Sequence, residues 1–200
     1  MGDNDFMELL FPEVFVKRIN IKEITPCTAD PDRIKFLAQA DRSLDEVLSI
    51  LYLAVPNAKL SEKLGALSYR NQQHLVTVFS SGRIGMTYVK DRQQAEKLVE
   101  ELRSLINRAF IHLKTHGKPE QALLEAKKGL SAMKIYEKLP KTNCKECGEQ
   151  GCFAFATKLL NSEKSLQDCS LLRLSENAEN RLRIEKMLMP IKLNNPIRGN

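Results

Sequence analysis

Four of the chain's five cysteines gather in one short stretch, where together they could bind a metal centre. They occur in the order Cys144-Lys-Glu-Cys147-Gly-Glu-Gln-Gly-Cys152, and Cys169 follows after a longer gap. Four thiolates can complete either a tetrahedral zinc site or an iron–sulfur cluster. In a reducing compartment such a group is typical of metal binding or catalysis rather than of disulfides.

The spacing of these cysteines favours a [4Fe–4S] cluster over zinc. Structural zinc commonly takes its thiolates from two Cys-x-x-Cys pairs, and only Cys144 and Cys147 form such a pair here. Three close ligands and one distant ligand suit a cluster, because its four iron corners lie wider apart than the ligand edges around one zinc ion. Zinc and redox-active or unpaired thiols stay open as alternatives.

The residues around the cysteines suit an anionic centre. Gly148 and Gly151 allow the backbone to curl tightly and to bring amide groups near sulfur. We predict a helix from Gly151 to Leu160, whose free N–H groups point toward the site. We expect nearby cations at Lys141, Lys145 and Lys158, a cap formed by Ser165 and Asp168 before Cys169, and exclusion of water by Phe153, Phe155, Leu159, Leu160 and Leu166.

The segment from Leu139 to Ala156, Leu-Pro-Lys-Thr-Asn-Cys-Lys-Glu-Cys-Gly-Glu-Gln-Gly-Cys-Phe-Ala-Phe-Ala, resembles the small iron–sulfur domain of corrinoid iron–sulfur proteins. Those proteins work with acetyl-CoA synthase/CO dehydrogenase, and a similar domain occurs in the B subunit of ion-pumping electron-transport complexes. The resemblance covers about residues 138–172, without the corrinoid-binding barrel or the ferredoxin-type cysteine runs. It implies one [4Fe–4S] cluster, with Cys144, Cys147, Cys152 and Cys169 as its ligands.

The size and composition of the chain are those of a folded protein with room for two small domains. It has 200 residues, of which 42% are hydrophobic and 28% charged, and its net charge is +6. No apolar run approaches the roughly 20 residues that a membrane span needs. The acidic first residues lack the order of a secretory signal. We therefore expect a cytoplasmic protein without membrane insertion.

The part of the chain before the cysteines has the pattern of an α+β domain. We predict a strand over residues 14–24 with a bulge or twist between Val16 and Ile19. We also predict a short helix opened by Asp30 and Pro31, and a helix opened by a Ser43–Glu46 capping box. Strand-like residues then run to Val89, with a hairpin turned around Ser81-Gly82. A long helix is predicted from its cap at Asp91 to Gly117.

The run Val76-Thr-Val-Phe79-Ser-Ser-Gly82-Arg-Ile-Gly-Met-Thr87, with the helix after Asp91, is similar to one half of TATA-box-binding protein. The similarity spans about residues 14–110 and implies a curved antiparallel sheet with helices on one face. That family reads DNA with a two-fold concave sheet, so DNA binding by this single half would require a homodimer. A sheet that serves as a scaffold or a partner surface is the simpler interpretation.

The predicted organisation has three parts. Residues 1–117 form the α+β domain, residues 118–139 a connecting helix, and residues 140–200 a small, mostly helical iron–sulfur domain with a helical tail. Within the last part, a charged helix is expected over residues 175–189, with an extended end from Pro190.

The remaining reactive side chains give weaker signals. His112 and His116 lie four residues apart on the long helix but lack the acidic partner of a metalloprotease motif. Cys27 is predicted to be an ordinary buried residue, and His74 a structural or surface residue. The sequence contains no serine-nucleophile elbow, phosphate loop or dinucleotide fingerprint. An electron carrier or accessory protein is therefore favoured over a stand-alone enzyme.

The sequence thus predicts an iron–sulfur protein that moves single electrons to or from a redox protein partner. A first alternative is a cluster- or zinc-stabilised regulatory module that recognises a protein or a nucleic acid, since the basic charge is compatible with either. A second is an accessory subunit of a corrinoid or CO/acetyl-CoA enzyme.

Overall fold

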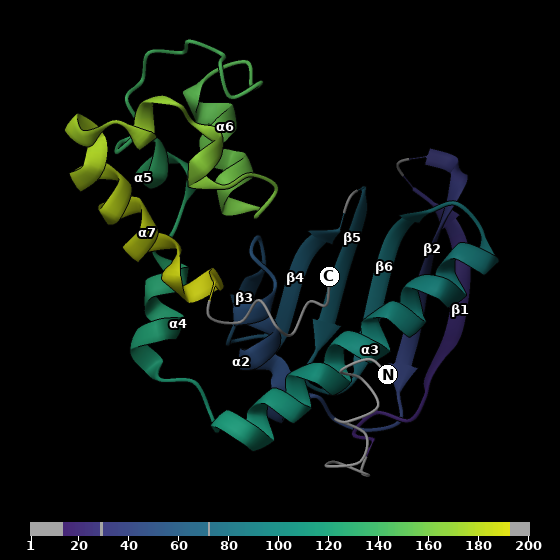
Figure 1. Ribbon diagram of the computed structural model, residues 1–200. Coiled ribbons are helices and arrows are strands. Elements are labelled where there is room, and N and C mark those ends of the chain that lie inside the picture. The colour runs from purple at the N-terminus through teal and green to yellow at the C-terminus, as the bar shows by residue number, and fades with distance from the viewer. Residues whose placement is uncertain (1–13, 29, 72, 193–200) are drawn as a thin grey trace, which may run out of the picture. The chain divides into compact units, whose positions relative to one another are not determined.

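A computed structural model of the chain describes residues 14–28, 30–71 and 73–192 (Figure 1). The chain divides into two compact units, the first ending at Pro119 and the second beginning at Glu120. Within the described residues, no helix combines the length and apolar character needed to cross a bilayer.

The first unit is built on a six-stranded sheet in which all neighbouring strands are antiparallel. Its spatial order is β1-β2-β6-β5-β4-β3. The strands are β1 (Ile19–Cys27), β2 (Asp30–Ala40), β3 (Lys59–Ser61), β4 (Ala66–Asn71), β5 (His74–Phe79) and β6 (Arg83–Val89). This sheet and its helices confirm the predicted α+β class.

Alternation along the strands gives the sheet one covered face and one open face. In β2, Phe36 is buried and the next residue, Leu37, is 43% exposed. In β5, Val76 is buried and the residue before it, Leu75, is also 43% exposed. The helices α2 (Asp45–Ala54) and α3 (Arg92–His116) cover the buried side (Figure 1). The stripe of α3 that packs there consists of Ala95, Leu98, Val99, Leu102, Ile106, Ala109, Phe110 and Leu113.

Local signals around the hairpin and the long helix are confirmed. β5 and β6 are joined by a turn in which the Gly82 amide donates to the Phe79 carbonyl at 2.9 Å. The Asp91 side chain accepts a hydrogen bond from the Gln94 amide at 2.8 Å and so caps α3. Gly117 ends the helix with a φ of 78°.

Three local predictions in this unit are wrong. The segment from Asp30 is the strand β2 rather than a helix, since its buried residues alternate and pair with both β1 and β6. The pairing of β1 with β2 shifts register between Ile21 and Glu23 and again between Pro26 and Cys27, not between Val16 and Ile19. Ser43 forms no capping box; its hydroxyl donates to the Ser80 carbonyl at 2.7 Å and so ties α2 to the hairpin turn.

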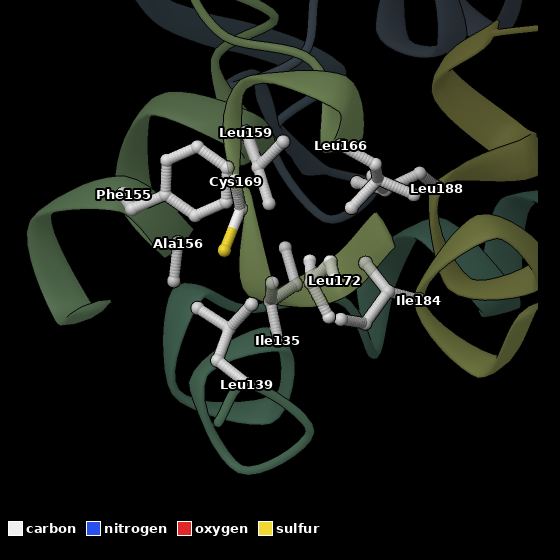
Figure 2. Packing of buried hydrophobic residues seen from close by; sticks show 10 residues of the cluster. All are labelled: Ile135, Leu139, Phe155, Ala156, Leu159, Leu166, Cys169, Leu172, Ile184 and Leu188. Carbon is white, nitrogen blue, oxygen red and sulfur yellow. The ribbon is translucent and has the colours of Figure 1, made fainter. Parts of the chain in front are cut away.

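The second unit consists of short helices around one apolar cluster. They are α4 (Gln121–Lys128), α5 (Ala132–Tyr136), α6 (Cys152–Leu160) and α7 (Ala178–Lys192), with single-turn 3₁₀ segments η1 (Leu166–Asp168), η2 (Leu171–Arg173) and η3 (Ser175–Asn177). Figure 2 shows the cluster, in which Phe155 and Leu159 of α6 lie beside Cys169, and Ile184 of α7 lies near Leu172. This core is what positions the cysteines.

The segment predicted as one connecting helix is instead broken into α4 and α5. The break falls at Gly129, and the Ser131 hydroxyl then caps α5 by accepting from the Lys134 amide. Ile135 and Leu139 belong to the core of the second unit, so this segment is part of that unit. The helix predicted near the C-terminus exists, but it continues through Pro190 to Lys192; the rest of the expected extended end lies outside the described residues.

Candidate metal centre

All four clustered cysteines line one pocket of the second unit. Cys144 and Cys147 come from the loop before α6, Cys152 is the first residue of α6, and Cys169 directly follows η1. The remaining walls are formed by Leu139, Pro140, Thr142, Lys145, Gly151, Phe155, Ser170 and Leu171. The structure therefore brings together the residues that the sequence grouped, including the distant Cys169.

The loop that carries Cys144 and Cys147 is held in an unusual backbone conformation. Asn143 and Lys145, on either side of Cys144, have positive φ values of 52° and 64°, and Gly148 has a φ of 82°. Alternation between left-handed residues and their neighbours turns backbone amides inward and creates concavities that favour anions. Such a loop suits a centre that carries several thiolates.

Gly151 allows this loop to approach the start of α6. The Asn143 Oδ1 accepts a hydrogen bond from the Cys152 amide at 2.9 Å. A Cβ atom at Gly151 would lie 2.9 Å from the same oxygen, so a larger residue would push the loop away. Gly148, with a positive φ, fits the predicted tight curl of the backbone, whereas Gly151 is needed for the close approach of Asn143.

The helix α6 begins at the site and is anchored by its apolar face. Cys152 opens the helix as predicted, so its positive end faces the cysteines. Phe155, Ala156 and Leu159 are buried in the core of the unit. The core thereby fixes the direction of the helix dipole relative to the pocket.

Cys169 is the buried member of the set, with an exposed fraction of 8%. As predicted, Ser165 and Asp168 form a capping box that shapes η1, and Cys169 is the residue that directly follows this turn. Burial raises the pKa of the Cys169 thiol, and the nearby Cys147 and Cys152 add to the rise, while amide hydrogen bonds from Leu172 and Leu171 oppose it. The thiolate form therefore needs a nearby cation or metal to be stable here.

The cations near the site differ in part from those predicted. Lys145 lines the pocket. Lys158 instead forms ion pairs with Glu149 at 3.5 Å and with Glu163 at 3.8 Å. Lys164, which the sequence reasoning missed, donates to the Cys147 carbonyl at 3.1 Å. Its position after the end of α6 depends on a turn that the sequence pattern did not reveal.

Phe153 does not shield the pocket from water, which corrects a second expectation. Its side chain is 47% exposed and meets the edge of the Tyr136 ring, with centroids 5.7 Å apart. Phe155, Leu159 and Leu166 are buried as expected, and Leu160 is partly buried.

The spacing of the donor atoms bears on which metal the pocket fits. Within the described ranges, no three His, Cys, Asp or Glu side chains are close enough to hold a single metal ion. The four cysteines nevertheless line one pocket, so the thiol groups that could bind a metal centre are gathered at a single place.

The other candidate residues do not form a second site. His112 and His116 stack with ring centroids 4.3 Å apart, and the His112 Nδ1 is buried without a hydrogen-bond partner among the described residues. Burial, aided by the neighbouring His116, lowers the pKa of His112. His74 is buried, and its Nδ1 lies 2.9 Å from the Tyr88 carbonyl, which agrees with the predicted structural role. Cys27 is a buried residue of the first unit, as predicted.

Comparison with known proteins finds a similarity to a family whose matched residues include the cysteines of this pocket. Residues 139–170 match the family described as "Putative Fe-S cluster". The gamma subunit of the acetyl-CoA decarbonylase/synthase complex of Methanocaldococcus jannaschii is 46% identical over 63 residues, or 32% of this chain and 13% of that protein. The corrinoid/iron-sulfur protein large subunit of Moorella thermoacetica is 48% identical over 40 residues, or 20% of this chain and 9% of that protein.

These similarities are confined to a small module. The chain spans only about an eighth of the length of the gamma subunits that it matches, including that of Methanothermobacter thermautotrophicus, which is 44% identical over 61 residues. No solved structure is significantly similar to the chain. The similarity of the first unit to half of TATA-box-binding protein therefore stays a prediction.

Proposed function

We propose that the chain is a cytoplasmic accessory protein that binds one [4Fe–4S] cluster through Cys144, Cys147, Cys152 and Cys169 and exchanges single electrons with a protein partner. The observation that carries this proposal is the single pocket lined by all four cysteines. The match of residues 139–170 to the family described as "Putative Fe-S cluster" supports it. When bound, such a cluster supplies one-electron transfer.

The chain's own residues would hold and tune this centre. The start of α6 and the Lys145 side chain oppose the negative charge of the thiolates. The amides of Leu171 and Leu172 donate to the Cys169 sulfur, and hydrogen bonds of this kind adjust the reduction potential. Phe155 and Leu139 exclude water from one side.

The matched relatives suggest the class of partner. The similar segments belong to subunits of the acetyl-CoA decarbonylase/synthase complex and to a corrinoid/iron-sulfur protein. We propose that this chain likewise serves a larger enzyme, for which a corrinoid or CO/acetyl-CoA enzyme is one candidate. Purification of the tagged chain from its own host under anaerobic conditions, followed by identification of bound proteins, tests this candidate.

Analysis of metal and sulfide tests the cluster directly. Protein purified without oxygen should contain about four iron and four sulfide per chain, and dithionite should produce the electron paramagnetic resonance signal of a reduced cluster. Cys169→Ala should lose most of the iron, whereas Cys27→Ala, a matched change at the fifth cysteine, should keep it. Stoichiometric zinc without sulfide would refute the proposal.

The open face of the sheet supports a second candidate function, the binding of nucleic acid. Strand register places Lys35, Lys59, Arg70 and Arg83 on the same face as the exposed Leu37 and Leu75. A hollow on this face is lined by Glu23, Thr25, Lys35, Phe36, Leu37, Gly85, Met86 and Thr87. Cations spread over an open sheet are suited to phosphate groups.

Fluorescence anisotropy with labelled duplex DNA tests this second function. We expect binding in 50 mM salt that weakens steeply as salt rises, because counterions are released. Lys35→Glu and Arg83→Glu should weaken it, while Lys97→Glu on the exposed side of α3 should not. Absence of binding at low salt would refute this function without affecting the cluster.

A further inference from the structure

An exposed aromatic side chain lies directly beside one of the proposed cluster ligands. Phe153 follows Cys152 in α6, and the core-facing residues of that helix are Phe155, Ala156 and Leu159. Phe153 is therefore turned away from the core, with 47% of its surface exposed. The exposed part of this large apolar side chain does not stabilise the fold, since burial is what makes such residues stabilising.

Phe153 is part of a continuous patch that reaches α5. Its ring packs edge-on against Tyr136, at an interplanar angle of 79°. The Lys141 ammonium lies 5.6 Å from the centre of the same Tyr136 ring. Met133, one turn before Tyr136 on α5, is 53% exposed. We call the surface formed by Met133, Tyr136, Lys141 and Phe153 the aromatic rim.

The segment that carries most of the aromatic rim is mainly basic. From Ser131 to Gly148 the chain contains four lysines, Lys134, Lys138, Lys141 and Lys145, and two glutamates, Glu137 and Glu146. Glu146 is hydrogen-bonded to the Ser170 hydroxyl, and Glu149 is engaged by Lys158 and Lys164. Lys141 forms no ion pair with any described residue. The rim therefore presents apolar groups together with uncompensated positive charge.

We propose that the aromatic rim is the docking surface for a small acidic one-electron carrier protein. The inference rests on the proposed function, because it takes the pocket beside Cys152 to hold a redox centre. Apolar and aromatic groups at the centre of an interface supply affinity, and complementary charge at its edge supplies the rate of encounter. One electron passes between the carrier's cofactor and the bound cluster; one centre is oxidised and the other reduced, and no bond or proton changes place.

Binding of a plant-type [2Fe–2S] ferredoxin, which is acidic, tests the proposal on the cluster-loaded protein. Anisotropy of the fluorescently labelled ferredoxin gives the affinity, and stopped-flow absorbance gives the electron-transfer rate constant. We expect measurable binding that weakens with salt, and no binding of the basic electron carrier cytochrome c. Equal binding of the two carriers would overturn the proposal.

Substitutions in the aromatic rim and on α7 test whether ferredoxin binds at the rim or elsewhere on the second unit. Phe153→Ser should weaken ferredoxin binding about tenfold, as truncation of an interface aromatic commonly does. Lys141→Asp should also weaken it and should flatten its salt dependence; aspartate tolerates the positive φ of 60° at this position. Leu182→Ser and Lys186→Asp on α7, where Leu182 is 51% exposed, serve as matched controls and should bind normally.

The outcomes separate this proposal from the proposed function. Wild-type protein without iron and sulfide would refute the proposed function itself. Iron-loaded rim variants that bind ferredoxin as the wild type does would refute the docking surface alone. If Phe153→Ser lowered the iron content, Met133→Ser and Lys141→Asp would still decide the question. A dimer of the wild type that Phe153→Ser dissociates would assign the rim to a second copy of the chain, and would overturn the proposal.

Discussion

The side chain of Asn143 and the backbone of Cys152 are joined by a hydrogen bond of 2.9 Å, from the Cys152 amide to Asn143 Oδ1. This bond fastens the loop that carries Cys144 and Cys147 to the first residue of α6. Three of the four proposed ligands thus belong to one hydrogen-bonded structure, which the sequence signals only as an asparagine beside a cysteine motif.

Asn143→Ala should loosen the cluster site. It removes an acceptor that satisfies an amide at a helix start, and loss of such a cap commonly costs about 1 kcal/mol. Alanine is also less suited than asparagine to the φ of 52° at this position. We expect faster loss of iron to a ferrous chelator under anaerobic conditions. Asn143→Asp keeps both the acceptor and the tolerance for this φ, and should release iron more slowly than Asn143→Ala; equal rates would contradict the role of the bond.

Gly82→Ala should destabilise the first unit strongly. Gly82 has a φ of 85°, and an added Cβ would lie 2.3 Å from the Arg42 carbonyl oxygen. Backbone strain and this clash together should lower the free energy of unfolding by roughly 2–4 kcal/mol. Thermal unfolding followed by circular dichroism measures the change.

Gly117→Ala is the matched control for this turn. Gly117 has a similar φ of 78°, but no heavy atom lies within 4 Å of the added Cβ. Only the conformational cost remains, which is about 1–3 kcal/mol for a φ of 78° with a ψ of −173°. Equal losses of stability in the two variants would show that the contact with Arg42 is unimportant.

The hairpin around Gly82 could be predicted because its signal is local, whereas β2 could not. Asp30 and Pro31 are the residues expected at a helix start, and they led to a wrong assignment. The strand forms because Phe36 and Ala38 pair with residues of β1, the preceding strand, and also with residues of β6, which lies far away in the sequence. Tertiary pairing of this kind overrides local propensity.

The grouping of the cysteines could be predicted because its signals are also local, whereas the lysine contact with the Cys147 carbonyl could not. The Cys-x-x-Cys pair, the glycines and the Ser165–Asp168 cap are short-range patterns, and the structure contains each of them. The choice between Lys158 and Lys164 depends on the turn after α6, where Ser162 has a φ of 59°. No pattern of residue types revealed this turn.

The pH dependence of the first unit should reflect the stacked histidines of α3. Burial and the adjacent His116 lower the pKa of His112 below its ordinary value of 6.5. Above pH 6.5 the ring is neutral in the folded and unfolded chain, so stability does not depend on this group. As the pH falls below 6.5, the unfolded chain binds the proton first, and the folded unit loses stability.

Replacement of His112 by glutamine should reduce this loss. Amide hydrogen exchange of β5 and β6, compared at pH 5.5 and 7.5 after correction for intrinsic rates, measures the local stability. We expect a smaller difference between the two pH values in His112→Gln than in the wild type. His74→Gln would be an unsuitable control because that ring bonds the Tyr88 carbonyl, so Lys114→Gln on the same helix is used instead. An unchanged difference in His112→Gln would contradict the assignment.

Lys164 and Lys158 should differ in their importance although each contributes one positive charge near the pocket. Lys164 donates to the Cys147 carbonyl at 3.1 Å, so Lys164→Met leaves a ligand-bearing loop without this bond. Lys158 makes only partly exposed ion pairs with Glu149 and Glu163, which are commonly worth about 0–1 kcal/mol. We expect Lys164→Met to lower the unfolding free energy by about 1–2 kcal/mol and to accelerate iron loss. Lys158→Met should have smaller effects on both the unfolding free energy and the rate of iron loss. Because the two variants remove the same charge, equal effects would mean that net charge, and not the bond to Cys147, stabilises the site.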